Sequence, residues 1–220
     1  MKLHKTLITL GLALTFFITA PVVAAELNAP QKVVKGISDQ LDKALQTNRE
    51  KLKSDRKEVY KLVNTIVDPR VDIERISKLI LGKKHWTSAT TKERKDFQNE
   101  FKSLLINTYA TAFTAFDDWT IHFIPMNLDK EAKRARIKTE IIQPGKPPIA
   151  INYRMVLSKK GSWKVYDVVI EGISMVTNYR SSFASSIKKS GNLSNVIKEL
   201  AAKNKKTSEQ SVTATQAKNS

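Results

Sequence analysis

The spacing of apolar residues changes from a helical period to an alternating one near Asp118, and this change restricts the fold more than any other feature of the chain. Upstream of it, helical spacing predicts four segments, at residues 28–45, 52–67, 72–82 and 90–116. Asp72 is expected to cap the third segment and Gly82 to end it, and Thr90 and Glu93 form a capping box that begins the fourth. The first half of the chain is therefore predicted to be helical.

Downstream of Asp118, apolar and polar side chains alternate, as they do in half-buried strands. The expected strands cover residues 119–123, 134–141, 149–157 and 162–172, with turns at "QPGKPP" and at Gly161. Helical spacing then returns at residues 174–188 and 194–203. Helices, then a meander of strands, then helices predict an α+β fold in which a curved antiparallel sheet packs against several helices around an apolar cavity.

The first 25 residues have the pattern of a secretory signal peptide, with two lysines, an apolar stretch and small residues that end at Ala25. The apolar stretch is shorter than the roughly 20 residues that a membrane-spanning helix needs. One folded domain is expected over residues 26–203. Residues 204–220 are poor in apolar side chains and are expected to form a disordered polar tail.

The formal net charge is +17, and loss of the signal peptide would remove two lysines and no acid. Such a charge attracts polyanions, and for an exported protein a membrane surface is favoured over nucleic acid as the partner. Arg134 and Arg136 alternate with apolar residues rather than with exposed aromatic ones, which disfavours a nucleic-acid surface. The alternative is that the charge only keeps the protein soluble. The sequence has no cysteine, so its stability must come from a packed core.

The strand at 162–172 holds two carboxylates, Asp167 and Glu171, in a run that from Val165 onward is otherwise almost wholly apolar. In a strand they would lie roughly 13 Å apart. That separation exceeds the spacings of about 5 to 9.5 Å at which paired carboxylates hydrolyse glycosides. They are therefore not predicted to form a catalytic pair, and Asp167 is expected to face an arginine or lysine of a neighbouring strand, or solvent.

Other catalytic patterns are equally incomplete. Ser174 follows a strand and a glycine, as in a nucleophile elbow, but Val176 replaces the second glycine, so Ser174 is expected to cap a helix instead. After removal of the signal peptide, His85 and His122 remain, and neither has an evident partner. The sequence has no metal-ligand spacing and no glycine-rich phosphate loop. No enzymatic activity, metal or cofactor is predicted.

Two blocks carry a resemblance to a known family: "DIERISKLILGKKHWTSATTKERKDFQNEFKSLLINTYATAF", residues 72–113, and "KTEIIQPGKPPIAINYRMVLSKKGSWKVYDVVIEGISMVTNYRSSF", residues 138–183. Together they resemble the MlaC family, the periplasmic phospholipid-binding proteins of the Mla intermembrane lipid transport system, also described as the toluene tolerance family. The resemblance covers nearly all of residues 27–203 and leaves the polar tail outside.

This resemblance implies an NTF2-like fold and a soluble, monomeric periplasmic carrier without enzymatic activity. Phospholipid would be its cargo, held by the acyl chains with the head group largely outside. Its partners would be an outer-membrane lipoprotein complex and an inner-membrane MCE-domain complex driven by an ABC ATPase. Shuttling between them would maintain the lipid asymmetry of the outer membrane.

The residues expected to line the lipid cavity come from the inner sheet face, the long helix and the turn after Gly172. They are Tyr109, Phe113, Ile137, Ile141, Ile149, Ile151, Tyr153, Met155, Tyr166, Val168, Ile170, Ile173 and Val176. On the strand at 163–170, Tyr166, Val168 and Ile170 are chosen because Val165 and Val169 share the face of Asp167.

Two alternatives remain open. A small-molecule enzyme on the same fold would need His122, Asp167 or Glu171 to point into the cavity. A basic adaptor that binds only protein would have a solid core without a cavity.

Overall fold

The computed structural model describes the backbone of residues 26–115 and 118–216, and the side chains of these residues except at 112–113, 115 and 210–216. The predicted signal peptide lies outside the described residues. The helices are α1 (Ala29–Ser54), α2 (Arg56–Leu62), the π-helical η1 (Val63–Val67), the 3-10 helix η2 (Asp68–Arg70), α3 (Ile73–Ser88), α4 (Thr91–Ala115), α5 (Met175–Ser190) and α6 (Leu193–Gln216).

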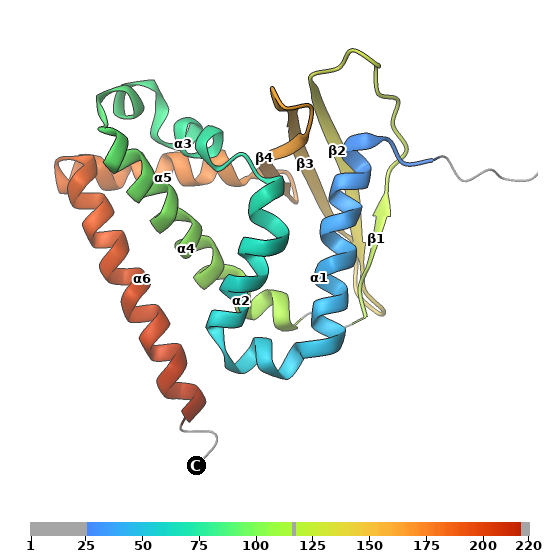
Figure 1. The fold of residues 1–220 in the computed structure, drawn as a ribbon, viewed down its shortest axis with the longest axis horizontal. Helices are drawn as coiled ribbons and strands as arrows, with labels where there is room; N and C mark the ends of the chain where they lie inside the picture. Colours follow the sequence, from blue (N-terminus) through green and yellow to red (C-terminus); the bar gives the residue numbers. More distant parts are fainter. Residues whose placement is uncertain (1–25, 116–117, 217–220) are drawn as a thin grey trace, which may run out of the picture.

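The strands form one antiparallel sheet in the order β1-β2-β3-β4-β5. They are β1 (Thr120–Phe123), β2 (Arg134–Ile142), β3 (Ile149–Leu157), β4 (Trp163–Ile170) and β5 (Ile173–Ser174). Sequential strands are neighbours, so the sheet is a meander. Helix α1 lies along the sheet, and the other long helices lie together to one side of it (Figure 1). The predicted α+β class is confirmed.

The predicted helix caps are present. The Thr90 amide donates to a carboxylate oxygen of Glu93 over 2.8 Å, and the Glu93 amide donates to Thr90 Oγ1 over 3.1 Å. Asp72 Oδ1 accepts from the Arg75 amide over 3.0 Å at the start of α3. Each cap binds an amide that the first helical turn leaves without a partner.

Two helix boundaries differ from the prediction. The first helix runs on to Ser54, past a break at Asn48 (φ −135°), and a new cap at Asp55 starts α2. The third does not stop at Gly82: the backbone leaves helical geometry there (φ 69°), and helical structure resumes and continues to Ser88. The second part of α3 places Trp86 in the core, which stabilises this continuation.

The last helix is longer than predicted, and residues 217–220 of the predicted tail lie outside the described residues. Helix α6 does not end at Lys203 but continues to Gln216. Asn204, which is 7% exposed, donates through Nδ2 to the Glu100 carbonyl over 2.9 Å and to Glu100 Oε2 over 2.7 Å. Buried hydrogen bonds to α4 thus hold the start of this segment, although it contributes few apolar side chains.

Three apolar clusters form the core. One joins α3, α4, α5 and α6, and in it Phe183 meets Phe97 edge to face with 5.0 Å between ring centroids. A second joins α1, α2 and α4 around Leu45. The third joins α1 to the sheet, where Val34 packs with Ile137 and Met155.

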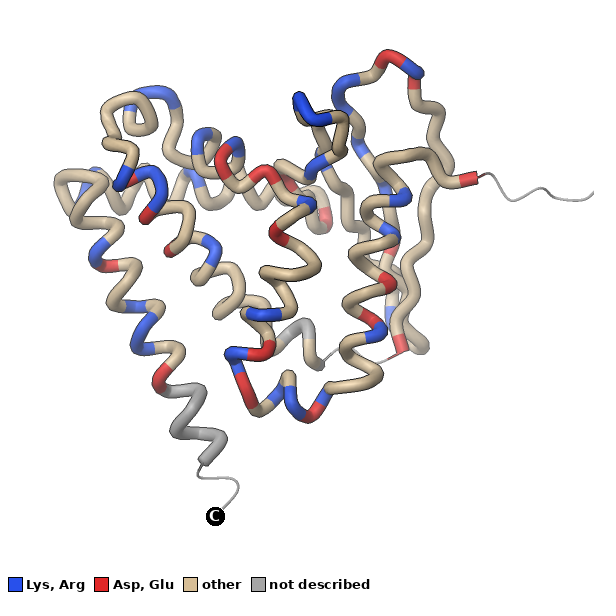
Figure 2. The backbone as a smooth tube through the Cα atoms, viewed as in Figure 1, with Lys and Arg blue, Asp and Glu red and all other residues tan. Residues whose placement is uncertain are grey.

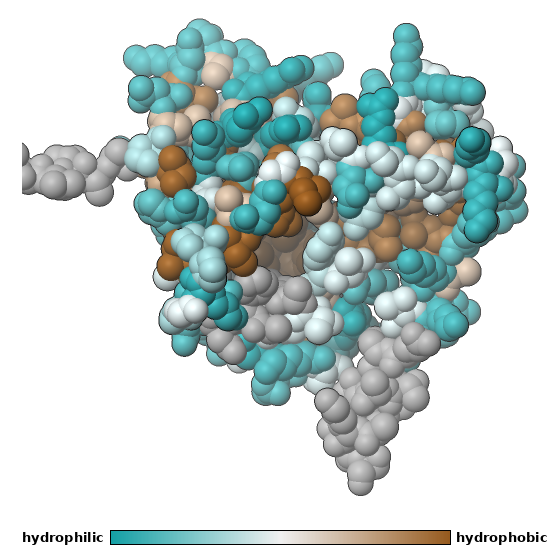
Figure 3. All heavy atoms as spheres, turned by 180° about the vertical axis from the view of Figure 1, so that it is seen from behind, coloured by the Kyte–Doolittle hydropathy of each residue, from teal (hydrophilic) through white to brown (hydrophobic). Residues whose placement is uncertain are grey.

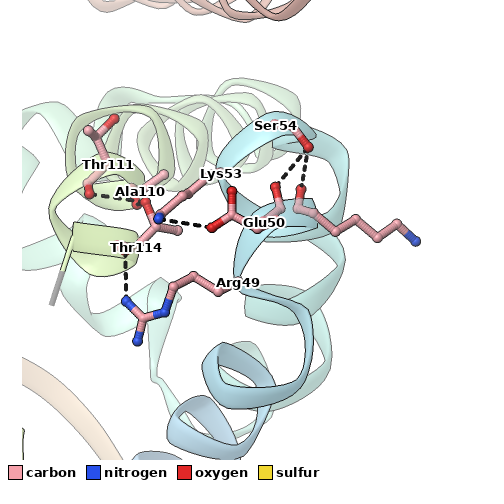
Figure 4. Close-up of polar contacts among 8 residues, drawn as sticks. Arg49, Glu50, Lys53, Ser54, Ala110, Thr111 and Thr114 are labelled. Carbon is pink, nitrogen blue, oxygen red and sulfur yellow. Dashed lines mark hydrogen bonds and ion pairs between the residues drawn. The ribbon is translucent and has the colours of Figure 1, made fainter. Parts of the chain in front are cut away.

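The end of α4 is tied to α1 by a polar contact. Arg49 Nη1 donates to the Thr114 carbonyl over 3.1 Å (Figure 4). Carbonyls at a helix C-terminus lack helical partners and carry partial negative charge, so a guanidinium there is favourable. One turn further along α1, Lys53 and Glu50 form a separate surface ion pair (Figure 4).

Strand β4 contains an irregularity that decides which side chains face inward. Arg154 of β3 pairs with Asp167, but the next residue, Met155, pairs with Val165, so Tyr166 has no partner and forms a β-bulge. As a result Val165 lies on the inner face with Met155, whereas Asp167 lies on the outer face with Arg154.

Candidate functional site

A cavity of about 350 Å³ lies where the sheet edge meets the helices. Its walls come from α2 and η1, α3, the middle of α4, strand β4 and the first turn of α5. Figure 3, which views the molecule from behind, shows a hollow with hydrophobic residues at its rim and floor. Its volume falls within the range of about 300 to 1,000 Å³ that small-molecule pockets occupy.

The cavity wall is almost wholly apolar. Aliphatic side chains supply most of it: Leu41, Val59, Leu62, Val63, Val67, Val71, Ile73, Ile76, Ile80, Leu105, Ile106, Ala110, Val165, Val168, Ile170 and Val176. Phe101, Tyr109 and Met175 complete the apolar part, and the charged contributors are Asp68, Lys102 and Asp167. The Tyr109 side chain is 40% exposed, so the cavity reaches the surface beside it.

Four of the residues expected from the sequence line this cavity: Tyr109, Val168, Ile170 and Val176. The side chain of Phe113 lies outside the described residues. The other eight do not line the cavity: Ile137, Ile141, Ile149, Ile151, Tyr153, Met155, Tyr166 and Ile173. Of these, Ile173 is 64% exposed in the short edge strand β5, and Tyr166 carries Arg75 over its ring at 5.9 Å.

Helix α1 explains why most of the sheet residues are absent from the wall. Val33 and Val34 of α1 pack on the inner face of the sheet, where Ile137 and Met155 are fully buried. Since α1 fills the space above β2 and β3, the cavity is displaced toward β4. The sequence predicted both the inner face of β2 and β3 and a helix at residues 28–45, but it carried no signal that this helix covers this face.

The helical residues that the prediction missed have a sequence signal. Ile73, Ile76 and Ile80 recur at intervals of three and four along α3, and Leu105 precedes Tyr109 by four on α4. Such spacing marks one helix face but does not show whether a core or a cavity adjoins it. The inward turn of Val165 depends on the bulge at Tyr166, which an alternating pattern cannot reveal.

Asp167 lines the cavity, but both oxygens of its carboxylate accept hydrogen bonds within the protein. Oδ2 accepts from Arg154 Nη1 over 3.0 Å and from Ser174 Oγ over 2.7 Å, and Oδ1 accepts from the Val176 amide over 3.1 Å. The expected arginine partner is thus confirmed. Ser174 also caps α5 as predicted, since Oγ accepts from the Thr177 amide over 3.1 Å. The carboxylate joins β4 to α5, and these three bonds occupy most of its roughly four acceptor sites.

The other two acid–base candidates lie away from the cavity. His122 is exposed on β1, with Nδ1 at 3.4 Å from a carboxylate oxygen of Glu140. Glu171 has a positive φ of 47° in the β4–β5 turn, and its carboxylate accepts from the Ala150 amide. Among the residues that the structure describes, no cluster of three or more His, Cys, Asp or Glu side chains could hold a metal ion.

One ion pair lies in the wall. Lys102 Nζ is 2.8 Å from Asp68 Oδ2, and both side chains are partly exposed. Lys102 and Tyr109 are seven residues apart on α4, so the cavity extends about 10 Å along this helix between them.

No helix in residues 26–115 or 118–216 is long and apolar enough to cross a membrane.

Comparison with known proteins places this cavity in a family context. The sequence model of the family described as "MlaC protein" matches residues 35–202. The chain belongs to the MlaC family. The predicted resemblance is therefore confirmed, and the matched region ends before the last turns of α6.

Two relatives and one solved structure are similar to this MlaC-family chain. The toluene tolerance protein ttg2D of Pseudomonas putida is 29% identical over 172 residues, which cover 78% of this chain and 79% of the relative. The intermembrane phospholipid transport system binding protein MlaC of Haemophilus influenzae is 27% identical over 193 residues, covering 87% and 89%. A phospholipid-binding protein from Ralstonia solanacearum, solved in complex with a phospholipid, superimposes with a TM-score of 0.76 at 28% identity, covering 82% of this chain and 99% of that one.

Proposed function

We propose that the protein is a periplasmic phospholipid carrier that encloses acyl chains in the cavity between β4 and the helices. The observation that carries this proposal is the apolar wall of a 350 Å³ cavity in a chain of the MlaC family. The phospholipid-bound Ralstonia solanacearum structure, which shares the fold, supports the same ligand class. An adaptor with a solid core does not account for the cavity.

The energetics of lipid transfer require such a wall. Two acyl chains carry about 30 methylenes, and exposing each to water costs about 0.8 kcal/mol, so an unshielded lipid faces a barrier on the order of 25 kcal/mol. Transfer from a bilayer into an apolar cavity exchanges one hydrocarbon environment for another, so its net free energy can be small. Direction must then come from partners that consume energy. We propose an outer-membrane lipoprotein complex and an inner-membrane MCE-domain transporter as those partners, with outer-membrane lipid asymmetry as the outcome.

We do not propose a catalytic role. His122 and Glu171 lie outside the cavity, and both oxygens of Asp167 already accept hydrogen bonds. A general base needs a free lone pair within hydrogen-bond reach of the substrate. We also propose that the protein uses no metal or cofactor, and that phospholipid is bound only as cargo.

Organic extraction of the purified exported protein, followed by mass spectrometry, tests the carrier function. Phospholipid should be recovered at a stoichiometric level from protein made in a lipid-containing host. Protein that is folded and consistently empty would count against the proposal.

A matched pair of variants tests the location of the site. Val168→Asp places a charge in the cavity wall, whereas Ile173→Asp makes the same change at an exposed position outside it. The first should reduce bound phospholipid and the second should leave it unchanged. Because Val168→Asp could also destabilise the fold, Val168→Phe is added: it fills the cavity without burying a charge, and it should lower occupancy too. Equal occupancy in all three variants would remove this cavity as the binding site.

A further inference from the structure

The outer face of the sheet carries a group of basic side chains that do not line the cavity. Along β2, three of them alternate with inward residues such as Ile137, and the strand register places two more beside them on β3 and β4. This set, which we call the cationic face, consists of Arg134, Arg136, Lys138, Arg154 and Lys164. Neighbouring strands are about 4.8 Å apart and alternate residues of one strand about 6.7 Å apart, so the charges form a dense array.

This array costs the isolated protein stability. Arg136 lies directly opposite Arg154 in the register of β2 and β3, and like charges at such positions are destabilising. Two acids share the face: Asp167 neutralises Arg154, and Glu140 is beside His122. In the described part of the chain, the remaining four members form no ion pair.

The helices show a different arrangement. Along α1, acidic and basic residues are interspersed (Figure 2), and ion pairs such as Lys35 with Asp39 and Lys53 with Glu50 balance them. A mixed pattern of this kind is sufficient for solubility. The excess of positive charge on the outer face of the sheet is therefore not explained by solubility, and it favours an anionic partner.

We propose that the cationic face docks on the anionic head-group layer of a phospholipid bilayer. A protein partner would need apolar or aromatic anchors at the centre of the contact. The exposed large hydrophobic residues of the described chain are Leu79, Tyr109 and Ile173, and none of them lies on this face. Arginine binds phosphate oxygens in a bidentate manner, and a layer of phosphates can meet the four cations that form no ion pair among the described residues without a fixed partner geometry.

The arrangement of β4 connects this face with the cavity. The same strand contributes Lys164 to the cationic face and Val165, Val168 and Ile170 to the cavity wall. Helix α1 lies in front of the sheet in Figure 1, so the view from behind in Figure 3 looks toward the outer side, and the hollow opens there. Docking through the cationic face would bring the cavity near the bilayer surface, although docking itself does not require a lipid in the cavity.

Vesicle co-sedimentation of the purified exported protein tests the proposal. One set of vesicles contains phosphatidylcholine and phosphatidylglycerol, and the other contains phosphatidylcholine alone. The face variant combines Arg136→Gln, Lys138→Gln and Lys164→Gln. The control variant removes the same charge from exposed positions on α6, with Lys198→Gln, Lys203→Gln and Lys206→Gln.

The wild type should sediment with the anionic vesicles only, and salt near 1 M, which shortens the Debye length to about 3 Å, should release it. Each cation at an anionic surface changes partition by about fivefold, so the face variant should bind about a hundredfold more weakly. The control variant should lose much less, and thermal melts should show both variants folded. Equal losses in the two variants would assign the effect to net charge and overturn the proposal. If the wild type did not sediment with anionic vesicles but bound an acidic protein, the proposal would be overturned in favour of a protein partner.

Discussion

Replacing the buried carboxylate Asp167 by asparagine should weaken the hydrogen-bonded contact between β4 and the start of α5. The side chain is 3% exposed and accepts from three donors, on Arg154, Ser174 and the Val176 backbone. An asparagine oxygen at the Oδ1 position can still accept from the Val176 amide. Its amide nitrogen, however, would then occupy the Oδ2 position, where it faces two donors and can accept from neither.

The magnitude follows from the two lost contacts. A hydrogen bond to a charged group contributes about 1.5 to 3 kcal/mol. The Arg154 side chain is 37% exposed and can regain water, so its loss is discounted, whereas the bond from the Ser174 hydroxyl is lost. We expect Asp167→Asn to lower the free energy of unfolding by about 2 to 4 kcal/mol. Because β4 and the first turn of α5 both line the cavity, bound phospholipid should be released faster as well.

Urea denaturation followed by circular dichroism measures the loss. The control is Asp96→Asn, which breaks the exposed ion pair of Asp96 with Lys92 and should cost less than about 0.5 kcal/mol. If Asp167→Asn destabilised the protein no more than this control, the carboxylate would not hold β4 and α5 together. If the variant were clearly destabilised but released lipid at the wild-type rate, lipid retention in the cavity would not depend on the contact between β4 and α5.

Three further variants probe other parts of the fold. Phe183→Ala should lower the free energy of unfolding by about 3 to 5 kcal/mol in urea titration, because Phe183 fills the aromatic cluster of α4 and α5; a loss under about 1 kcal/mol would mean that the cluster collapses around the gap. Asn204→Ala should cost about 1 to 2 kcal/mol and speed amide exchange at the start of the last turns of α6, and unchanged exchange would show that the bonds to Glu100 do not hold this segment. Burial raises the pKa of the Tyr153 phenol to about 12, against the opposing effect of the Thr139 hydroxyl. Since the unfolded pKa is about 10, stability should be full below pH 10 and fall as pH rises toward 12, and thermal melts should show that Tyr153→Phe removes this loss.

Local patterns predicted the elements well because each depends on a few neighbouring residues. Thr90 with Glu93, Asp72 and Ser174 cap the helices that the sequence assigned to them. The alternation in β2 and β3 correctly separated Ile137 and Met155, which are buried, from the exposed Arg136. Hydrogen bonds and periodic burial within one segment do not require knowledge of the rest of the chain.

The cavity was harder to predict because it depends on what covers each face. Ile137 was expected at the wall and is instead buried under α1, and no spacing within the strand distinguishes these outcomes. Ile73 and Ile76 have the pattern of ordinary core residues but line the cavity. Whether an apolar side chain meets a protein atom or open space is decided by the packing of distant segments, which the sequence does not show directly.

The bulge at Tyr166 has a consequence for how this region can change during evolution. Without Tyr166, β4 would alternate regularly, and Val165 and Val168 would still face inward while Asp167 faced outward. A deletion of this single codon should therefore conserve the cavity wall, and the main loss would be the contact of the ring with Arg75. A deletion elsewhere in β4 would turn the side chains between that position and the bulge to the opposite face. Homologues that differ in length at Tyr166 can thus share the same binding surface, whereas those that differ two residues further on cannot.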